Sequence, residues 1–498
     1  MTRAASESES VTADSATTTR GESTFETDIP ARLDRLPWTA FHWLLITALG
    51  VTWVLDGLEV TVVAAVGNAL VNPGTLGLTA AEVGIAQTCY LCGAIGGALL
   101  FGHLTDQLGR KKLFTITLLI YLAGAFLTAL SWNAVSFALF RLVTGMAIGG
   151  EYAAINSAID ELIPARVRGR VDLAINGTFW LGAMAGAAVS IPLLNPHLLP
   201  EWLGWRLAFG LGALIGFGMI IARRFVPESP RWLLTHGRLD EAEKVMTSIE
   251  KHAAGHALPP ILGKLTIRAG HQIGFKSIAH TMLVRYRSRA VLGLVLIASQ
   301  AFFYNGISFS FPLVLGQFYS VPTDRTGVYV LVMAAANFLG PLLLGSLFDS
   351  VGRRRMIAAT YAVSGSLIIV TLPLFLRHDL TAATQTAVWA ATFFFASAAA
   401  SAGYLTVSEV FPLEMRALAI ALFYALGTAI GGMGAPALFG RLLESGPTPL
   451  ACGYVAGAAL MLLAAGTEWW LGVDSERKSL EDVTSPLSAE NSGGSVTA

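Results

Sequence analysis

The sequence predicts an all-α membrane protein in which twelve transmembrane helices form two pseudo-symmetric bundles of six. Three observations lead to this fold class. The chain of 498 residues is 54% hydrophobic and 13% charged, with a mean hydropathy of +0.61, which is too apolar for a soluble protein of this length. Apolar segments long enough to cross a bilayer recur along the chain, and two short charged motifs each occur twice at half-chain spacing.

The charged motifs divide the chain into two related halves. Residues 102–112 read Gly-His-Leu-Thr-Asp-Gln-Leu-Gly-Arg-Lys-Lys, and a weaker copy at 349–355 reads Asp-Ser-Val-Gly-Arg-Arg-Arg. Glu-Leu-Ile-Pro at 161–164 likewise returns as Glu-Val-Phe-Pro at 409–412. The copies are offset by about 243 and about 248 residues, so the repeat covers half of the protein rather than a small module.

Each half contains six apolar segments of about 19 to 28 residues, the length that a helix needs to span a bilayer. In the first half they lie at 40–68, 80–103, 113–131, 134–160, 172–194 and 205–224. In the second half they lie at 290–317, 326–348, 356–376, 383–408, 417–440 and 450–472.

The polar parts of the chain set the domain boundaries. We expect one six-helix bundle at 38–224 and the other at 290–472, joined by a polar loop at 225–289. The tails at 1–37 and 473–498 are rich in small polar and charged residues and poor in large apolar ones. We therefore expect both tails to be disordered.

Apolar residues recur at helical spacing within the central loop and predict a short amphipathic helix against the membrane face or the bundles. They are Leu239, Ala242, Val245, Met246 and Ile249. Most of the 33 Lys and Arg residues fall in the tails and in loops on one side of the predicted spans, and loops with this bias face the cytoplasm. We therefore expect a multi-pass protein of the cytoplasmic membrane with both termini inside the cell and no cleaved signal peptide.

The composition argues against several other functions. Lys and Arg balance Asp and Glu, 33 each, so no basic field attracts nucleic acid. Cys89, Cys92 and Cys452 all fall in apolar segments, and the first two have no partner pair or His cluster nearby, so we interpret them as small packing residues. No Ser-His-Asp set, metal-ligand spacing or phosphate-binding loop indicates an enzyme, and no cofactor is required.

Twelve spans in two repeated halves, with the motif at 102–112 between the second and third, resemble the major facilitator superfamily of transporters. The stretch from Arg141 to Glu151 is similar to the Gly-rich fourth helix of sugar porters, and Pro-Glu-Ser-Pro-Arg-Trp-Leu at 227–233 is similar to a sugar-porter signature. The turn at 409–416 resembles the matching turn after the tenth helix. The resemblance covers about residues 38–472.

Two stretches depart from the sugar-porter pattern. Asp56-Gly-Leu-Glu59 resembles the Asp-Gly-x-Asp element of proton symporters for aromatic acids and metabolites. In the seventh span, Ser299-Gln300 and Tyr304-Asn305 stand where sugar porters carry a paired Gln and a downstream Asn, so the sugar site is matched only in part. The substrate stays open between a sugar or polyol and a small carboxylate such as an aromatic acid.

Charged residues inside spans are costly and therefore informative. Asp56 and Glu59 lie three residues apart and share one face of the first span, and Arg141 in the fourth span lies at a similar depth, so an acid–arginine pair can form. Proton-coupled sugar porters use such a pair, and the resemblance implies Glu59 with Arg141 for proton coupling, with Asp56 as a second or alternative site. A fixed structural ion pair and an Arg141 that holds a substrate carboxylate are the alternatives.

A second set of charged residues lies in the turns on the predicted cytoplasmic side. They can form ion pairs that hold the halves together when the carrier faces outward, although charges that only set topology are the alternative. The resemblance places Glu151 in the same gate. In the first half the set is Asp106, Gly109, Arg110, Glu151, Glu161 and Arg168, and in the second half it is Asp349, Gly352, Arg353, Glu409 and Arg416.

Polar residues in otherwise apolar spans are candidates for substrate contact, although each alone is more often a satisfied interhelical hydrogen bond. They are Gln300, Tyr304, Asn305, Asn176, Trp180, Asn337 and Tyr404, with Asn156 and Thr406 as further members. Phe302, Phe303 and the Phe run at 393–395 lie near them in sequence. Together they predict a cavity with polar and aromatic walls.

The sequence therefore predicts a secondary active transporter of a small organic solute that works by alternating access, with proton symport favoured. A uniporter, an exporter of the same fold and a solute sensor that does not transport are the alternatives. The expected partners are the substrate, protons and the lipid bilayer, without nucleic acid, and we expect a monomer to be functional.

Overall fold

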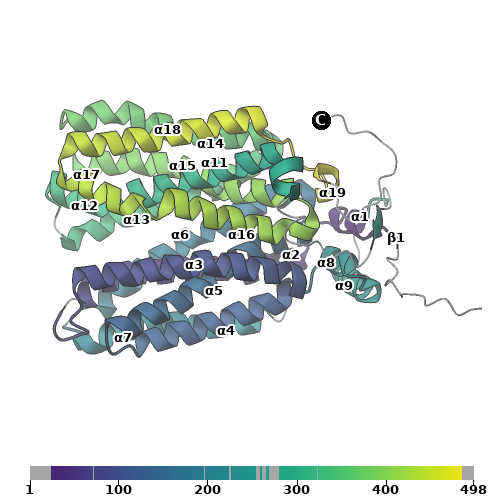
Figure 1. The fold of residues 1–498 in the computed structure, drawn as a ribbon, viewed down its shortest axis with the longest axis horizontal. Coiled ribbons are helices and arrows are strands. Elements are labelled where there is room, and N and C mark those ends of the chain that lie inside the picture. Colours follow the sequence, from purple (N-terminus) through teal and green to yellow (C-terminus); the bar gives the residue numbers. More distant parts are fainter. Residues whose placement is uncertain are drawn as a thin grey trace, which may run out of the picture.

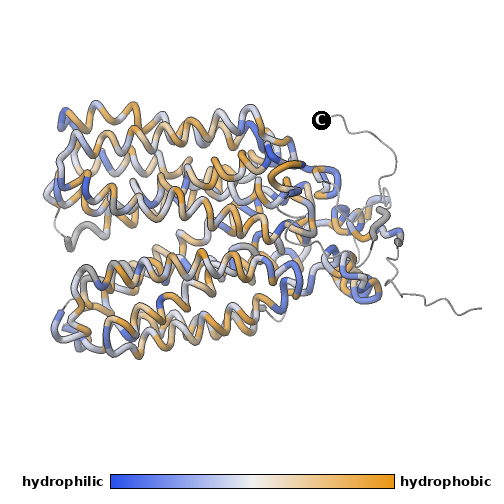
Figure 2. The backbone as a smooth tube through the Cα atoms, in the orientation of Figure 1, coloured by the Kyte–Doolittle hydropathy of each residue, from blue (hydrophilic) through white to orange (hydrophobic). Residues whose placement is uncertain are grey.

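The computed structural model describes residues 24–70, 72–195, 197–223, 226–253, 258–260, 265–268, 280–321 and 323–484. It confirms the predicted fold class, because two bundles of long helices lie side by side and small elements gather at one end (Figure 1). Apolar residues follow the long helices, while hydrophilic residues concentrate at their ends and in the small elements (Figure 2).

The first bundle contains six long helices with the predicted order. They are α2 (Ala40–Leu70), α3 (Ala80–Leu108), α4 (Arg110–Ala129), α5 (Ala134–Leu162), α6 (Arg168–Leu193) and α7 (Glu201–Arg223). Two of these helices begin at capping boxes, in which Thr79 and Asn133 each accept a backbone hydrogen bond from the third residue of the helix. A short 3₁₀ turn, η1 (Ala165–Val167), leads into α6.

The second bundle repeats this order, but two of its spans are interrupted by a turn of π-helix. The seventh span is α11 (Arg287–Phe303), η3 (Tyr304–Ser308) and α12 (Phe309–Tyr319). The eleventh span is α16 (Arg416–Gly427), η5 (Thr428–Gly432) and α17 (Ala435–Glu444). The uninterrupted spans are α13 (Thr323–Ser350), α14 (Arg353–Leu376), α15 (Ala382–Val410) and α18 (Pro447–Leu471), and the short turns η2 (Thr281–Arg285) and η4 (Leu413–Met415) precede α11 and α16.

Among the described residues, ten helices are long and apolar enough to cross a membrane, and Arg416–Gly432 is a shorter apolar helix. Together with α7 they make up the twelve predicted spans. Observed ends differ from the expected ones by up to about five residues, the usual uncertainty of helix boundaries read from sequence. The second span, for example, continues from the expected residue 103 to Leu108.

Glycines let the helices of the first bundle approach at backbone distance. A Cβ atom on Gly149 of α5 would lie 1.9 Å from the carbonyl oxygen of Ala94 on α3, and one on Gly182 of α6 would lie 1.9 Å from the carbonyl oxygen of Val54 on α2. Only glycine permits such contacts. The close packing fixes α2 and α5, which carry the proposed coupling residues, against their neighbours.

Six small elements form what we call the cap, at the end of the bundles where the charged turns lie (Figure 1). They are β1 (Thr24–Thr27), α1 (Ile29–Asp34), α8 (Pro230–Thr235), α9 (Leu239–Lys251), β2 (Leu265–Arg268) and α19 (Leu480–Val483). The strands pair antiparallel, with Thr24 opposite Arg268 and Thr27 opposite Leu265. Helix α9 is the amphipathic helix that the sequence predicts, and its residues Ala242, Met246 and Ile249 are buried.

The expectation of disorder over 1–37 and 473–498 is wrong for the parts of the tails that the structure describes. In the first tail, Ile29 and Leu33 are buried, and in the second Leu480 and Val483 are buried. In each tail a pair of apolar residues, spaced by one helical turn, anchors a short helix in the cap, and the polar composition concealed them. Residues 1–23 and 485–498 lie outside the described part, so the expectation stays untested there.

The three cysteines are free thiols. Their predicted packing role holds at most for Cys89, which is half-buried. Cys92 and Cys452 are exposed, because they lie on the outward faces of α3 and α18.

Candidate functional site

Glu59 on α2 and Arg141 on α5 form a buried ion pair within the first bundle. Their side chains are 3% and 1% exposed, and Arg141 Nη1 donates a hydrogen bond to Glu59 Oε1. The guanidinium also lies 4.2 Å from the centroid of the Tyr90 ring on α3, a cation–π contact. The structure therefore brings together the acid and the arginine that the sequence analysis pairs.

This ion pair is incompletely satisfied. Glu59 Oε2 and the Nε and Nη2 atoms of Arg141 are buried without a hydrogen-bond partner among the described residues. A buried pair of this kind stabilises a protein little, whereas removing one partner leaves an uncompensated charge. The arrangement can therefore change partner or protonation state more readily than a fully bonded network.

Asp56 lies one helical turn before Glu59 and has different partners. The hydroxyl of Tyr152 on α5 donates to Asp56 Oδ2 at 2.5 Å, and that of Tyr90 donates to Asp56 Oδ1 at 3.3 Å. Tyr90 thus contacts Asp56 through its hydroxyl and Arg141 through its ring. Glu59 therefore contacts Arg141 directly, and Asp56 is connected to the same arginine through Tyr90.

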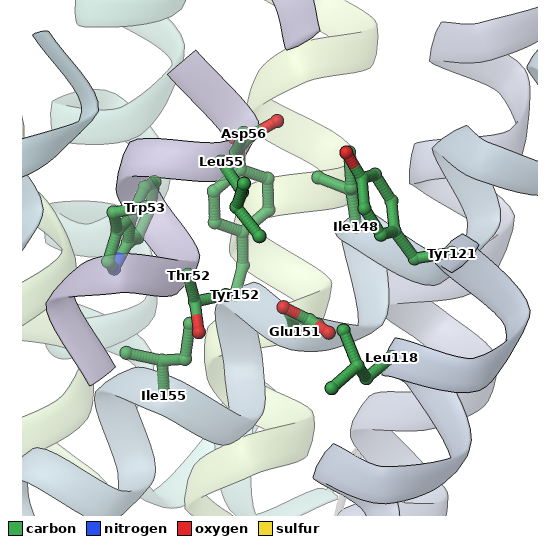
Figure 3. Close-up of a pocket in the computed structure, with 10 residues that line it drawn as sticks. All are labelled: Thr52, Trp53, Leu55, Asp56, Leu118, Tyr121, Ile148, Glu151, Tyr152 and Ile155. Atoms are coloured by element: carbon green, nitrogen blue, oxygen red, sulfur yellow. The ribbon is translucent and has the colours of Figure 1, made fainter. Parts of the chain in front are cut away.

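A small cavity inside the first bundle adjoins Asp56 (Figure 3). Its volume of about 20 Å³ is enough for about one water molecule. Glu151 and Tyr121 also line it, and Glu151 accepts a hydrogen bond from the Thr117 hydroxyl at 3.2 Å.

This position corrects the expectation that Glu151 is part of the gate. Glu151 lies ten residues before Glu161 on α5, or about 15 Å along the helix axis. Its carboxylate faces the cavity beside Asp56 instead (Figure 3). The resemblance to the family led to the gate assignment, and helix geometry alone could have excluded it.

Aromatic side chains from both halves meet beside Asp56. The ring of Tyr152 lies 4.6 Å from that of Tyr424 on α16 and 6.4 Å from that of Tyr404 on α15. Trp53 packs on the other side of Tyr152 at 4.6 Å. Asp56 is therefore placed next to a layer of aromatic rings at the interface between the halves.

Three of the predicted substrate residues converge at a second point of this interface. Trp180 of α6 lies 5.8 Å from the ring of Tyr304 in η3, and the Tyr304 hydroxyl donates to Asn337 Oδ1 on α13 at 2.7 Å. Phe393 lies 5.2 Å from Tyr304. Gln300 lies beside Tyr404, so it joins the first aromatic layer.

The other predicted substrate residues are hydrogen-bonded to nearby backbone or side-chain groups. Asn305 donates to the carbonyl oxygen of Ala301 at 2.8 Å, as expected for a satisfied polar residue. Asn176 donates to Asn156 Oδ1 at 3.3 Å and to the carbonyl oxygen of Asp172 at 3.0 Å. Asn176 therefore lies one helical turn from Trp180 on the side of Asp172.

The gate residues form the same ion pairs within each half. Arg110 contacts Glu161 at 2.6 Å in the first half, and Arg353 contacts Glu409 at 3.2 Å in the second. Each arginine also contacts the aspartate one turn earlier. These contacts are Arg110 with Asp106 at 3.4 Å and Arg353 with Asp349 at 2.7 Å.

The same aspartates bond to the first turn of a helix in the opposite half. Asp106 Oδ2 accepts from the backbone N–H of Leu418 on α16 at 3.0 Å. Asp349 accepts from the N–H groups of Gly169 and Arg170 on α6, at 3.1 and 2.9 Å. Carboxylates are favoured at helix N-termini because the N–H groups there lack helical partners.

Two further contacts cross between the halves at the capped end. Arg168 lies 3.5 Å from Glu409, and Arg416 lies 3.8 Å from Glu161. The two aspartate contacts and these two ion pairs are related by the internal repeat. Together they close this end of the protein.

Gly109 and Gly352, which stand just before the gate arginines, have positive φ angles of 91° and 115°. Non-glycine residues rarely adopt this conformation. The turn after Gly109 also lets the backbone N–H of Arg110 donate to Glu228 at 2.9 Å. These two glycines of the repeated motif therefore shape the turns that precede α4 and α14, whose first residues are the gate arginines.

The cap adds a bridge that the sequence analysis missed. Arg231 of α8 contacts Asp34 of α1 at 3.2 Å and Glu481 of α19 at 2.8 Å, and Arg168 lies 3.7 Å from Asp34. Burial tends to raise the pKa of Glu481, but the charge of Arg231 outweighs it and the pKa lies below its usual value. One arginine thus joins both tails to the central loop, and only the signature at 227–233 hinted at its importance.

The sequence analysis also missed Asp160 near the end of α5 and Asp172 near the start of α6. Both are fully buried, with no hydrogen-bond partner for their carboxyl oxygens among the described residues. The sequence could have indicated these residues, because charged side chains are unusual within apolar spans and both acids lie within them. Among the described residues, no group of three or more His, Cys, Asp or Glu side chains is placed to hold a metal ion.

A two-bundle membrane fold with buried charges inside it and a repeated gate at one end is the architecture of a secondary transporter. The chain matches the sugar (and other) transporter family over residues 47–481. It belongs to that family, within the major facilitator superfamily, and is a membrane transporter of sugars or other metabolites rather than an enzyme.

Relatives and solved structures agree with this family. The chain is 28% identical to the niacin transporter NiaP of Acinetobacter baylyi over 92% of this chain and 99% of that protein. It is 26% identical to a D-xylose transporter of Levilactobacillus brevis over 82% of this chain and 88% of that one. A structure of the proton:xylose symporter XylE, bound to 6-bromo-6-deoxy-D-glucose, superposes with a TM-score of 0.72 at 19% identity and covers 89% of this chain and 98% of that one.

Proposed function

We propose that the protein is a proton-coupled symporter for a small organic solute, with a small aromatic carboxylate as the first candidate substrate. The observation that carries the coupling is the buried ion pair of Glu59 and Arg141 inside the membrane. Protonation of Glu59 removes its attraction for Arg141 and frees the guanidinium, so proton binding changes the contacts between α2 and α5.

Asp56 supplies the argument for an obligatory proton with an acidic substrate. Asp56 lies beside the aromatic layer of Tyr152, Tyr404 and Tyr424, where a planar ring can stack. An anionic substrate there would be repelled by an ionised Asp56 in a low-dielectric surrounding. Binding of the anion therefore favours a protonated Asp56, and substrate and proton enter together.

Arg141 provides the cation for a carboxylate in this scheme. Two of its nitrogen atoms already lack hydrogen-bond partners among the described residues, and a guanidinium suits bidentate recognition of a carboxylate. When Glu59 is protonated, the substrate can take its place near Arg141. The niacin transporter among the relatives, matched over 99% of its own length, agrees with a substrate of this class.

Alternating access then follows from the closed gate. The contacts of Asp106, Asp349 and the two crossing ion pairs hold the capped end shut, and we take this end to be cytoplasmic. Binding of substrate and proton stabilises rearrangement of the halves, after which these contacts break and the solute leaves on the cytoplasmic side.

A sugar or polyol is the second candidate substrate. Tyr304 and Asn337, which are hydrogen-bonded to each other beside Trp180, offer the hydroxyl and amide groups that bind sugar hydroxyls. Relatives named as D-xylose and myo-inositol transporters agree with it.

The test is uptake by the purified protein in proteoliposomes. Labelled nicotinate, benzoate, D-xylose and myo-inositol are supplied with and without an inward proton gradient, and Glu444→Gln, an exposed acid on α17, serves as the matched control for Glu59→Gln. We expect the gradient to drive accumulation of an aromatic acid by the wild type and the control, while Glu59→Gln equilibrates the substrate without accumulating it. Accumulation of a sugar alone would favour the second candidate, and uptake indifferent to the gradient would contradict symport.

A further inference from the structure

Asp160 and Asp172 have no role in the transport cycle described so far. Asp160 lies two residues before the end of α5 and Asp172 lies in the second turn of α6, close enough to influence each other electrostatically. Both side chains are 0% exposed, and none of their four carboxyl oxygens has a hydrogen-bond partner among the described residues. An ionised carboxylate without such partners is strongly disfavoured in a protein interior.

The nearest neutral donors are already used. The Ser408 hydroxyl, next to Asp160, donates to the carbonyl oxygen of Leu405 at 2.8 Å. The Asn176 amide, next to Asp172, donates to the backbone carbonyl of Asp172 and to Asn156. Each of these neutral donors thus has another acceptor, and neither carboxyl group has a donor committed to it alone in this conformation.

The charged groups around the two acids belong to the gate. Asp160 interacts electrostatically with Arg416 of α16, Arg168 of α6 and Glu409 of α15, and Asp172 interacts in the same way with Glu409 and Arg353 of α14. From the remaining charged turns, Arg110 of α4 is paired with Glu161, and Asp349 of α13 caps α6. The cations that could neutralise Asp160 or Asp172 are thus engaged with other carboxylates while the gate is closed.

Of the cations near the two acids, Arg168 is the one that belongs to the same half. It lies 3.5 Å from Glu409 in the other half and 3.7 Å from Asp34 in the cap, and its Nε and Nη2 atoms are buried without hydrogen-bond partners among the described residues. The contact with Glu409 joins the two halves and depends on the closed conformation of the capped end, whereas Asp34 is also bonded to the backbone N–H of Ala165 in the first half. Arg168 and the two acids, by contrast, lie in the same half and stay together when the halves separate.

The internal repeat shows that the two acids are not part of the shared gate. At the offset of about 248 residues that relates Glu161 to Glu409, Asp160 corresponds to Ser408 and Asp172 to Ile420. The second half forms its side of the gate without acids at these positions. The pair is therefore an addition to the first half, and a role in packing or topology alone does not require it.

We propose that Asp160 and Asp172 form a second proton-binding site, which is protonated while the capped end is closed and loses a proton when that end opens. Opening breaks the contact of Arg168 with Glu409 and admits water, so a carboxylate becomes stable and pairs with Arg168. The proton leaves to the compartment on the capped side, and reclosure requires that a proton return. The site thus links the pH of that compartment to the position of the gate.

The inference rests on the proposed transport cycle but has its own readout. Spin labels at Gln107 and Val351, exposed residues at the capped ends of the two halves, report opening by double electron–electron resonance in chains whose three cysteines are replaced by serine. In Glu59→Gln with Asp56→Asn, where neither acid of α2 can titrate, we expect the ratio of open to closed chains to rise about tenfold per pH unit in the range where one proton is released. When Asp160→Asn and Asp172→Asn are added to this background, we expect less than about a twofold change over the same range.

A second double variant distinguishes loss of the proton-binding site from misfolding of the first. Asp160→Ser with Asp172→Ile installs the residues that the second half carries at the matching positions, and we expect it to lose the pH response in the same way. Glu444→Gln is the control and keeps the response. A pH response that persists in both double variants, or that is absent before they are introduced, overturns the inference.

The two proposals fail separately. If the wild type accumulates substrate under a gradient but the pH response of the gate does not depend on Asp160 and Asp172, only this inference is wrong. If the pH response depends on the two acids but no gradient drives accumulation, the site exists and the proposed symport is wrong.

Discussion

The two halves of the transporter are alike at the capped end and different inside the membrane. At the capped end each half pairs an arginine with two acids, and each sends an aspartate to a helix N-terminus of the other, as Asp106 and Asp349 do. Inside the spans, leaving aside the acids of this gate, the buried acids are distributed unevenly among the described residues. The first half has Asp56, Glu59, Glu151, Asp160 and Asp172, and the second half has Glu468 near the end of α18.

This difference separates two tasks. The contacts that keep the gate closed have to be present on both sides of the interface, because each half must release the other when the gate opens. Titratable groups are needed on one side only, and burying more of them would cost free energy without adding a function. We infer that the first half handles protons, while neutral groups such as Tyr304 and Asn337 of the second half contribute to recognition of the substrate.

The largest expected effect concerns the ion pair of the first half. Glu59→Ala leaves Arg141 buried and uncompensated, and we expect a loss of about 3 to 5 kcal/mol in the free energy of unfolding. Glu59→Ala with Arg141→Ala removes both charges and should cost clearly less than either single change, which thermal unfolding in detergent can measure. Additive losses would mean that the two residues do not act as a pair.

The repeated gate can be tested by treating its two sides equally. Asp106→Ala and Asp349→Ala each remove the acceptor for backbone N–H groups of the opposite half, and we expect each to favour the open form by about 1 to 3 kcal/mol. Spin-label distances across the capped end give the populations. Strongly unequal effects would show that the gate is not symmetric in energy although it is symmetric in contacts.

A smaller effect is expected from the neutral site of the second half. Tyr304→Phe removes one hydrogen bond to Asn337, and we expect the apparent affinity for substrate to fall by about 2- to 10-fold. The ratio of accumulated to external substrate at saturation should not change. Loss of accumulation in this variant would place coupling in the second half and break the distinction between the halves.

The smallest effect is expected in the cap. Hydrogen bonds from Arg32, with burial opposing them, hold the pKa of Glu250 on α9 below its usual value. Because the pKa is lowered, this contact stabilises the folded protein at pH values above the pKa of Glu in the unfolded chain, about 4.3. This stability is lost only as the pH falls below that pKa. We therefore expect protease protection of the first tail to be constant between about pH 5 and about pH 8, and a loss of protection within that range would contradict the role of this pair.

The fold and much of the site could be predicted because they depend on local patterns. Hydrophobic length predicts the twelve spans, and two charged motifs at half-chain spacing predict the gate. Depth in the membrane made an acid–arginine pair between the first and fourth spans possible, and the resemblance to proton-coupled sugar porters singled out Glu59 with Arg141.

The remainder depends on contacts that have no local pattern. The bonds of Asp106 and Asp349 go to backbone N–H groups, which every residue but proline has. The order of the cap rests on Arg231, whose partners Asp34 and Glu481 come from the two ends of the chain. Glu151 was misplaced because its assignment relied on resemblance, although its distance from Glu161 along one helix was already fixed.

The separation of tasks between the halves is tested most directly by comparing Glu59→Gln with Asn337→Ala in the same proteoliposome assay. Exchange of labelled substrate and its accumulation under a proton gradient are measured for both variants and for Glu444→Gln. The account predicts that Glu59→Gln retains exchange and loses accumulation, while Asn337→Ala retains accumulation at saturating substrate with a raised KM. Accumulation by Glu59→Gln, or its loss in Asn337→Ala at saturation, would contradict the assignment of proton coupling to the first half.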